Sequence, residues 1–140
     1  MDQFLAPTPV RVLIDLRGND LTAIRDAAAI AADFEDAVLQ RFLERPGFNL
    51  GLLKKLLDFA TEHANSRTRE LKSAAQIKAG TALATDIQRL IDLRKINDHV
   101  RPEEIEMAQE QLLHTQAAIE HARLRLDSIR LVVEGPTQPD

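Results

Sequence analysis

The sequence predicts a mostly helical domain of the α+β class, with three helices and a small sheet of two strands. Two observations predict the helices: 20 leucines and 19 alanines stand against 5 glycines, and apolar residues recur every three or four positions. Two short segments of alternating apolar residues predict the strands. With 140 residues, 44% of them hydrophobic, the chain is long enough to build one domain around one core.

The N-terminal part is predicted to be extended. Residues 1–9 contain Pro7 and Pro9, which cannot continue a helix, so we expect an extended arm that joins the domain to an upstream one. Residues 10–16 alternate apolar side chains with others, which predicts the first strand. The alternating apolar residues are Val10, Val12, Ile14 and Leu16.

Three segments carry the helical periodicity. The first spans about 21–44 and is stopped by Pro46, and the second spans about 50–96 with no proline inside it. The third spans about 102–127 and has Pro102 at its first position, where a proline is tolerated. Apolar residues of the third helix repeat every seven positions and form a narrow seam suited to helix packing. They are Ile105, Leu112, Ile119 and Leu126.

The C-terminal part completes the expected architecture. Residues 129–134 alternate again and predict the second strand, and residues 135–140, with two prolines and a glycine, predict a disordered tail. Short loops join the outer helices to the middle one, so each should fold back beside one half of it in a long antiparallel helical hairpin. The two strands then flank neighbouring helix ends and are expected to pair. Residues 10–134 are therefore predicted to form a single domain.

Composition excludes several classes of function. The net charge of −4 argues against nucleic-acid binding through bulk positive charge. Without cysteines there is no disulfide framework and no cysteine-based zinc site. No apolar stretch approaches the 18 residues that a membrane span needs, and the N-terminus lacks the pattern of a signal peptide. We expect a cytoplasmic protein with no membrane partner.

No constellation of residues indicates an enzyme. Residues 78–81 contain Lys-Ala-Gly-Thr but lack the first glycine and the preceding strand of a phosphate-binding loop. Glu110 and His114 stand four residues apart, a spacing that suits two metal ligands on one helix face, but a third strong ligand is missing. The serines have no nucleophile motif. We therefore expect no catalytic residues, no cofactor and no metal.

Arginines are the candidate binding residues, because the expected closure gathers five of them around the small sheet. Such a patch would suit an acidic partner or a nucleic-acid backbone. The patch consists of Arg11, Arg17, Arg123, Arg125 and Arg130. In the alternative, the strand arginines pair with carboxylates across the sheet. The absence of Tyr and Trp removes the usual stacking residues of single-strand binders and weakens the nucleic-acid version.

Segments near both ends resemble one family. Residues 8–15 (TPVRVLID), 100–105 (VRPEEI) and 124–133 (LRLDSIRLVV) are similar to the C-terminal region of the RapA (HepA) family. This family comprises bacterial RNA-polymerase-associated ATPases of the Swi/Snf helicase-like superfamily, and the resemblance spans about residues 5–134.

The resemblance implies a parent protein that hydrolyses ATP, binds core RNA polymerase and promotes its recycling during transcription. None of the family's ATPase motifs matches a position here, so it implies a non-catalytic C-terminal domain with a docking or regulatory role. The implied partners are the RNA polymerase core or the ATPase domains of the parent chain, with nucleic acid reached through the parent protein. The alternative is a stand-alone helical-hairpin scaffold that binds a partner helix.

Overall fold

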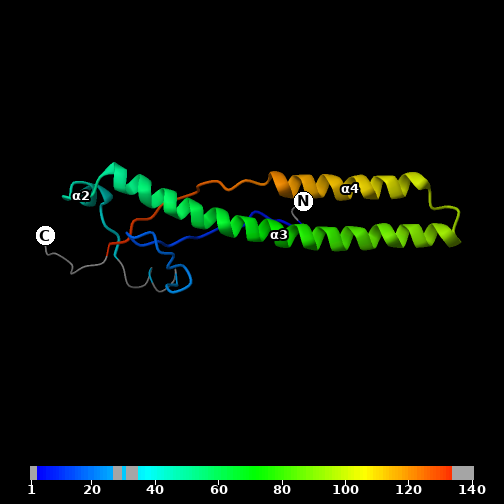
Figure 1. The fold of residues 1–140 in the computed structure, drawn as a ribbon, viewed down its shortest axis with the longest axis horizontal. Helices are drawn as coiled ribbons and strands as arrows, with labels where there is room; N and C mark the ends of the chain where they lie inside the picture. The colour runs from blue at the N-terminus through cyan, green and yellow to red at the C-terminus, as the bar shows by residue number, and fades with distance from the viewer. Residues whose placement is uncertain (1–2, 27–29, 31–34, 134–140) are drawn as a thin grey trace. The chain divides into compact units, whose positions relative to one another are not determined.

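The computed structural model describes residues 3–26, 30 and 35–133, and those residues contain three helices (Figure 1). The helices are α2 (Leu39–Leu43), α3 (Leu50–Ile96) and α4 (Pro102–His121). The chain divides into two compact units. Unit 1 consists of Met1–Arg11 and Glu62–Arg123, and unit 2 consists of Val12–Thr61 and Leu124–Asp140. Helix α3 contributes residues to both units.

Helix α3 has the bounds that its proline-free sequence predicted. It starts after Asn49, whose side-chain oxygen accepts a hydrogen bond from the backbone N–H of Leu52 at 2.8 Å and satisfies one of the free donors of the first turn. At the other end, Arg94 and Lys95 lie in the last turn, where positive charge is favourable beside the free carbonyl groups. Local signals therefore fix both ends of the 47-residue helix.

Helix α4 starts as predicted but ends six residues early. Pro102 occupies its first turn together with two glutamates, as the sequence indicated. The prediction of a helix to residue 127 is wrong, because the chain leaves the helix at Ala122 (φ −57°, ψ 136°). Two cationic side chains, Lys72 and Arg123, donate to the last carbonyl groups, and they satisfy acceptors that a continuing helix would otherwise use.

The predicted sheet is wrong: neither 10–16 nor 129–133 forms a strand, and residue 134 lies outside the described residues. Within the part of the chain that the structure describes, the β-type pairing is one isolated antiparallel bridge between Ile14 and Asp20. The chain turns back on itself there, and the N–H of Leu21 donates to the carbonyl of Leu13 at 2.7 Å. Backbone groups that a distant strand would need are thus used within a local loop.

The first predicted helix, 21–44, is also wrong as a continuous element. Residues 22–24 form a turn, residues 35–38 are not helical, and the helix that follows them is the five-residue α2. Residues 27–29 and 31–34 lie outside the described residues. Asp20 does make a bond typical of a helix start, since its side chain accepts a hydrogen bond from the backbone N–H of Thr22 at 3.0 Å. The hydroxyl of Thr22, however, accepts a hydrogen bond from the backbone N–H of Leu13. That bond ties the turn to the preceding loop and favours a loop over a helix.

The core of unit 1 lies between α3 and α4, which run antiparallel within this unit (Figure 1). Its centre consists of Ala75, Ala79 and Ile119, with Phe4 and Leu5 of the N-terminal segment packed against them. The small alanine side chains allow close approach of the helices. All buried apolar residues found among the described residues belong to unit 1: Ala64, Ala75, Ala79, Leu83, Ile87 and Ile119.

Candidate functional site

The five predicted arginines are all exposed and divide between the two units. Arg11 and Arg123 belong to unit 1, whereas Arg17, Arg125 and Arg130 belong to unit 2. The sheet that was expected to gather them, and across which the alternative paired them with carboxylates, is absent from the described residues. A shared arginine patch therefore stays a prediction.

Arg123 has a structural contact at the end of α4. One nitrogen of its guanidinium donates to the carbonyl of Glu120 at 3.1 Å and to that of Ala122 at 3.2 Å. Lys72 of α3 donates to the same two carbonyls, at 2.5 Å and 3.4 Å. Lys72 was missed by sequence reasoning, because nothing in the sequence links it to residues 48 and 50 positions away. The two cations together cap α4.

The N-terminal segment is attached to α3 at two levels. Phe4 and Leu5 pack on the buried cluster, and the guanidinium of Arg67 donates to the backbone carbonyl of Arg11. Arg11 therefore contributes its backbone to this attachment. The predicted arm is thus partly packed against the helices of unit 1.

Arg17 lies in a tight turn that is organised by Asp15. The Asp15 carboxylate accepts hydrogen bonds from the backbone N–H of Arg17 at 2.8 Å, from that of Asn19 at 2.9 Å and from the Asn19 side chain at 2.9 Å. The bond from the Asn19 side chain is the main cause that lowers the pKa of Asp15 below its ordinary value, and the backbone bond from Asn19 adds to it. Asp15 therefore serves its own turn.

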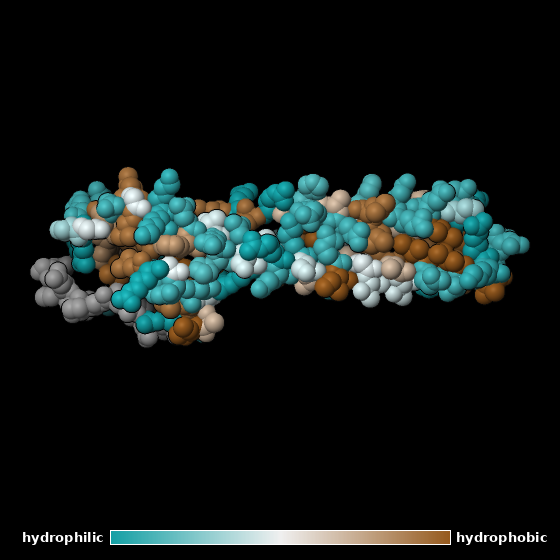
Figure 2. Space-filling model, in the orientation of Figure 1, coloured by the Kyte–Doolittle hydropathy of each residue, from teal (hydrophilic) through white to brown (hydrophobic). Residues whose placement is uncertain are grey.

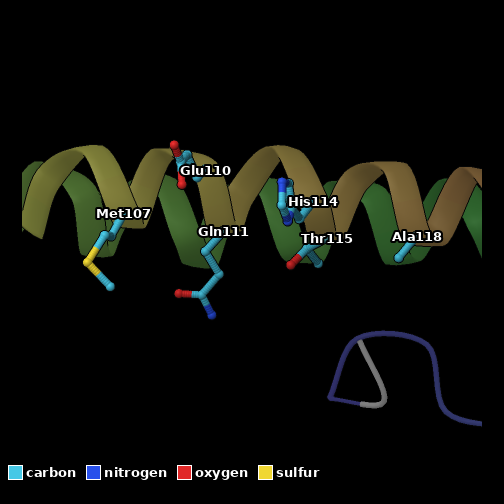
Figure 3. A pocket seen from close by; sticks show the side chains of 6 residues that line it. All are labelled: Met107, Glu110, Gln111, His114, Thr115 and Ala118. Carbon is cyan, nitrogen blue, oxygen red and sulfur yellow. The ribbon is translucent and has the colours of Figure 1, made fainter.

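A shallow hollow lies along α4, and Figure 3 shows the side chains that line it: Met107, Glu110, Gln111, His114, Thr115 and Ala118. It contains Glu110 and His114, the pair whose spacing suits two metal ligands. Throughout the described residues, no group of three or more histidine, aspartate or glutamate side chains is placed to hold a metal ion. The hollow therefore offers two apolar side chains, Met107 and Ala118, among polar ones.

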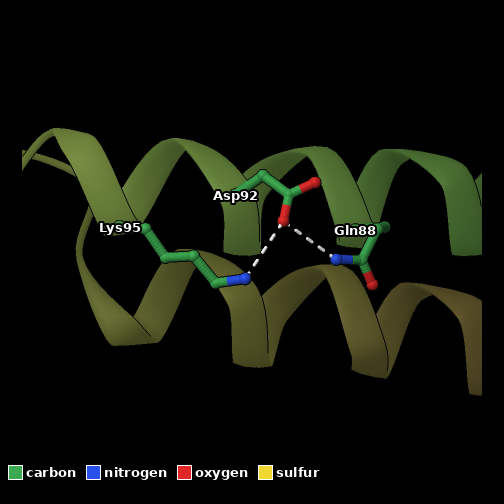
Figure 4. Close-up of polar contacts among 3 residues, drawn as sticks. All are labelled: Gln88, Asp92 and Lys95. Atoms are coloured by element: carbon green, nitrogen blue, oxygen red, sulfur yellow. Dashed lines mark hydrogen bonds and ion pairs between the residues drawn. The ribbon is translucent and has the colours of Figure 1, made fainter.

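A second hollow lies near the loop between α3 and α4, and sequence reasoning missed it. It is lined by Ile91, Arg94, Lys95 and Ile105. The Nζ of Lys95 lies 3.5 Å from a carboxylate oxygen of Asp92, which also accepts a hydrogen bond from Gln88 at 3.0 Å (Figure 4). These exposed groups interact weakly, because water screens them. The hollow thus combines two apolar side chains with two cations.

No helix within the described residues is long and apolar enough to cross a membrane.

Comparison with known proteins decides the family. Residues 1–134 match the family described as the RNA polymerase recycling family C-terminal, RapA_C. The chain belongs to this family. The match includes the three helices of the described residues, and it confirms the resemblance seen in the sequence.

Curated relatives agree with the family. The chain is 30% identical over 135 residues to the RNA polymerase-associated protein RapA of Actinobacillus pleuropneumoniae serotype 3, and 31% identical over 135 residues to that of Vibrio atlanticus. These alignments cover 96% and 95% of this chain, which spans only 14% of the length of each relative. No solved structure matches the chain significantly. The family is thus that of a C-terminal domain of RNA polymerase-associated proteins.

Proposed function

We propose that the chain acts as a non-catalytic C-terminal domain of an RNA-polymerase-associated, ATP-dependent protein of the Swi/Snf helicase-like type, with a docking or regulatory role in transcription and polymerase recycling. The observation that carries the proposal is the family match over residues 1–134. The proposed partners are the RNA polymerase core or the ATPase domains of the parent protein, with nucleic acid reached through that protein.

The predicted arginines supply the proposed contact surface. Their structural contacts decide which of them are suitable for a mutational test. Arg125 and Arg130 are exposed and belong to unit 2, in a segment that is neither helix nor strand. Their guanidinium groups suit carboxylates or phosphates of a partner. Arg123 also caps α4, so its replacement would change the helix end together with any partner contact. Arg125 and Arg130 are therefore the better residues for a test.

The test is capture of RNA polymerase core by the purified chain at low and high salt. We expect capture that weakens as salt increases, and a loss of about tenfold or more in the Arg125→Glu/Arg130→Glu variant, because like charges across an interface cost several kcal/mol. The control is Lys54→Glu/Lys78→Glu, which makes the same change of charge at two exposed positions of α3. Full capture by the arginine variant would contradict the arginine surface.

Two further measurements decide the wider proposal. The same capture assay is repeated with the ATPase domains of a RapA protein. If neither polymerase core nor ATPase domains bind, the docking role is wrong. ATP turnover by the purified chain would contradict the non-catalytic assignment.

One observation supports the alternative, a stand-alone scaffold that binds a partner helix. Leu113 of α4 is an apolar residue on the hairpin of unit 1 and is 65% exposed. Under this alternative Leu113→Lys abolishes partner binding, whereas Arg125→Glu/Arg130→Glu leaves it unchanged. The two readouts separate the candidate functions.

A further inference from the structure

The part of the hairpin near the α3–α4 loop has apolar residues that its two helices do not bury. Past Ala79, the buried residues of α3 are Leu83 and Ile87. Ile91 and Ile105 are half-buried, and Leu113 is 65% exposed. Figure 2 shows apolar surface between the two helices toward this loop. Two helices offer each other one face only, so apolar residues beside that face stay in contact with water.

We name this region the tip surface and define it by Ile91, Arg94, Lys95, Ile105 and Leu113. The first four line one hollow. Leu113 follows Ile105 by eight residues, a spacing that keeps it on the same side of α4 two turns away. The tip surface is thus an apolar strip with cations on its α3 edge.

The two helices beside this strip differ in charge. Helix α4 contains five glutamates and no lysine or arginine, and all five glutamates are exposed. The part of α3 in unit 1, residues 62–96, contains seven basic and four acidic residues. One hairpin therefore presents an acidic helix beside a basic one. A surface complementary to this hairpin has an acidic helix opposite α3 and a basic helix opposite α4.

We propose that a second copy of this chain covers the tip surface, with the hairpins of two unit 1 regions stacked into an antiparallel four-helix bundle. A two-fold axis parallel to the helices places α3 of one copy on α4 of its partner, so basic meets acidic. An axis across the helices would instead place α3 on α3 and α4 on α4, which like charges disfavour. Charge thus selects the first arrangement, and a bundle of four helices buries the strip.

The level of the charges along the helices fits this arrangement. Ile91 and Ile105 line one hollow, so they lie at the same height in the hairpin. An axis parallel to the helices keeps that height in both copies. Arg94 and Lys95 of one copy then come near the partner's Glu103 and Glu106, within about two helical turns along the bundle. Each dimer contains this contact twice.

The first test compares two matched substitutions on α4. Leu113 and Met107 are 65% and 68% exposed, but Met107 lines the other hollow, outside the tip surface. Sedimentation velocity is measured over chain concentrations of about 10–500 µM, a range that detects weak dimers. We expect a species of twice the 15.7 kDa chain mass for the native sequence and for Met107→Lys. Leu113→Lys should weaken dimerisation at least about tenfold.

The second test reverses the charges. Arg94→Glu/Lys95→Glu should abolish the dimer, and adding Glu103→Lys/Glu106→Lys to the same chain should restore it. Circular dichroism of each variant checks that helicity is retained. Rescue by the second reversal distinguishes charge pairing between copies from damage to one copy.

Three outcomes would overturn the proposal. A native chain that is monomeric throughout the concentration range has no such interface. Equal loss of the dimer in Met107→Lys and Leu113→Lys would place the contact elsewhere. A dimer that survives the first charge reversal would not depend on the α3–α4 pairing.

Discussion

Unit 1 buries apolar side chains, whereas none of the unit 2 side chains whose exposure the structure describes is buried. Both units contain leucine, isoleucine and valine in periodic patterns. In unit 1 the helical backbone satisfies its own hydrogen bonds, and α4 then needs only a short loop to reach α3. In unit 2 the predicted strands lie more than 100 residues apart, so their pairing would have to offset the cost of closing a long loop. Periodic apolar residues thus form a buried core in the unit whose backbone hydrogen bonds are made within helices.

The largest expected effect comes from a test of this contrast that replaces one isoleucine with alanine in each unit. Ile119→Ala in unit 1 removes a side chain with 0% exposure from the buried cluster. We expect the free energy of unfolding to fall by about 2–5 kcal/mol, because a cavity forms where the helices meet. Urea unfolding followed by the helical circular dichroism signal measures this loss.

Ile129→Ala is the control in unit 2, where the side chain is 56% exposed. We expect a change within about 0.5 kcal/mol, as for most surface substitutions. If both variants lost several kcal/mol, Ile129 would be buried in solution and the contrast between the units would fail.

Sequence could predict the features of this fold that depend on neighbouring residues. The proline-free stretch gave α3 its bounds, and Pro102 gave α4 its start. The end of α4 could not be predicted, because it depends on Lys72, which is remote in sequence. The prediction of a sheet was wrong for a related reason. Alternation of apolar residues indicates which face a strand would bury, but it does not indicate whether a partner strand lies beside it.

The candidate sites show the same division. The arginines could be selected by residue type, but their division between the two units depends on tertiary structure. The second hollow was not found from sequence because Ile91 and Ile105 come from different helices, and each looks like an ordinary seam residue. The family, in contrast, was evident from the short segments near both ends.

A second test, with a smaller expected effect, measures the stability of the loop around Gly18 in unit 2. Gly18 has φ +84°, and a Cβ added there would lie 3.0 Å from the ring of Phe59. We expect Gly18→Ala to destabilise the loop by about 1–3 kcal/mol, through the left-handed backbone and the contact with the ring. Hydrogen exchange of the Asn19 and Leu21 amides, which donate within this loop, measures the effect.

Gly47→Ala separates the two causes. Gly47 has φ +90° with nothing within 4 Å of an added Cβ, so only the backbone cost remains, about 1–2 kcal/mol. The destabilisation by Gly18→Ala beyond that by Gly47→Ala reports the packing of Phe59 on Gly18. If the Gly18 variant left exchange at Asn19 unchanged, the loop of unit 2 would not be folded as described.

The smallest expected effect is on pH dependence, and it is confined to unit 2. Hydrogen bonds from Asn19 lower the pKa of Asp15 in the folded turn below its ordinary value. A carboxyl with a lowered folded pKa contributes stability that is present above the unfolded pKa, about 3.9, and is lost as pH falls through the folded pKa. We therefore expect the amide signals of Arg17 and Asn19, which donate to this carboxylate, to shift below about pH 4 in an NMR titration.

Asp15→Asn shows whether the carboxylate causes this shift. The amide oxygen of asparagine still accepts a hydrogen bond but does not titrate in this range, so the pH-dependent shift at Asn19 should disappear while the turn persists. The amide of Ala79, in the buried cluster of unit 1, should show no matching titration in either protein. A shift at Asn19 that survives Asp15→Asn would assign the acid sensitivity to another group. A simultaneous shift at Ala79 would show that the two units respond to acid together, so that their difference in burial would not separate their stabilities.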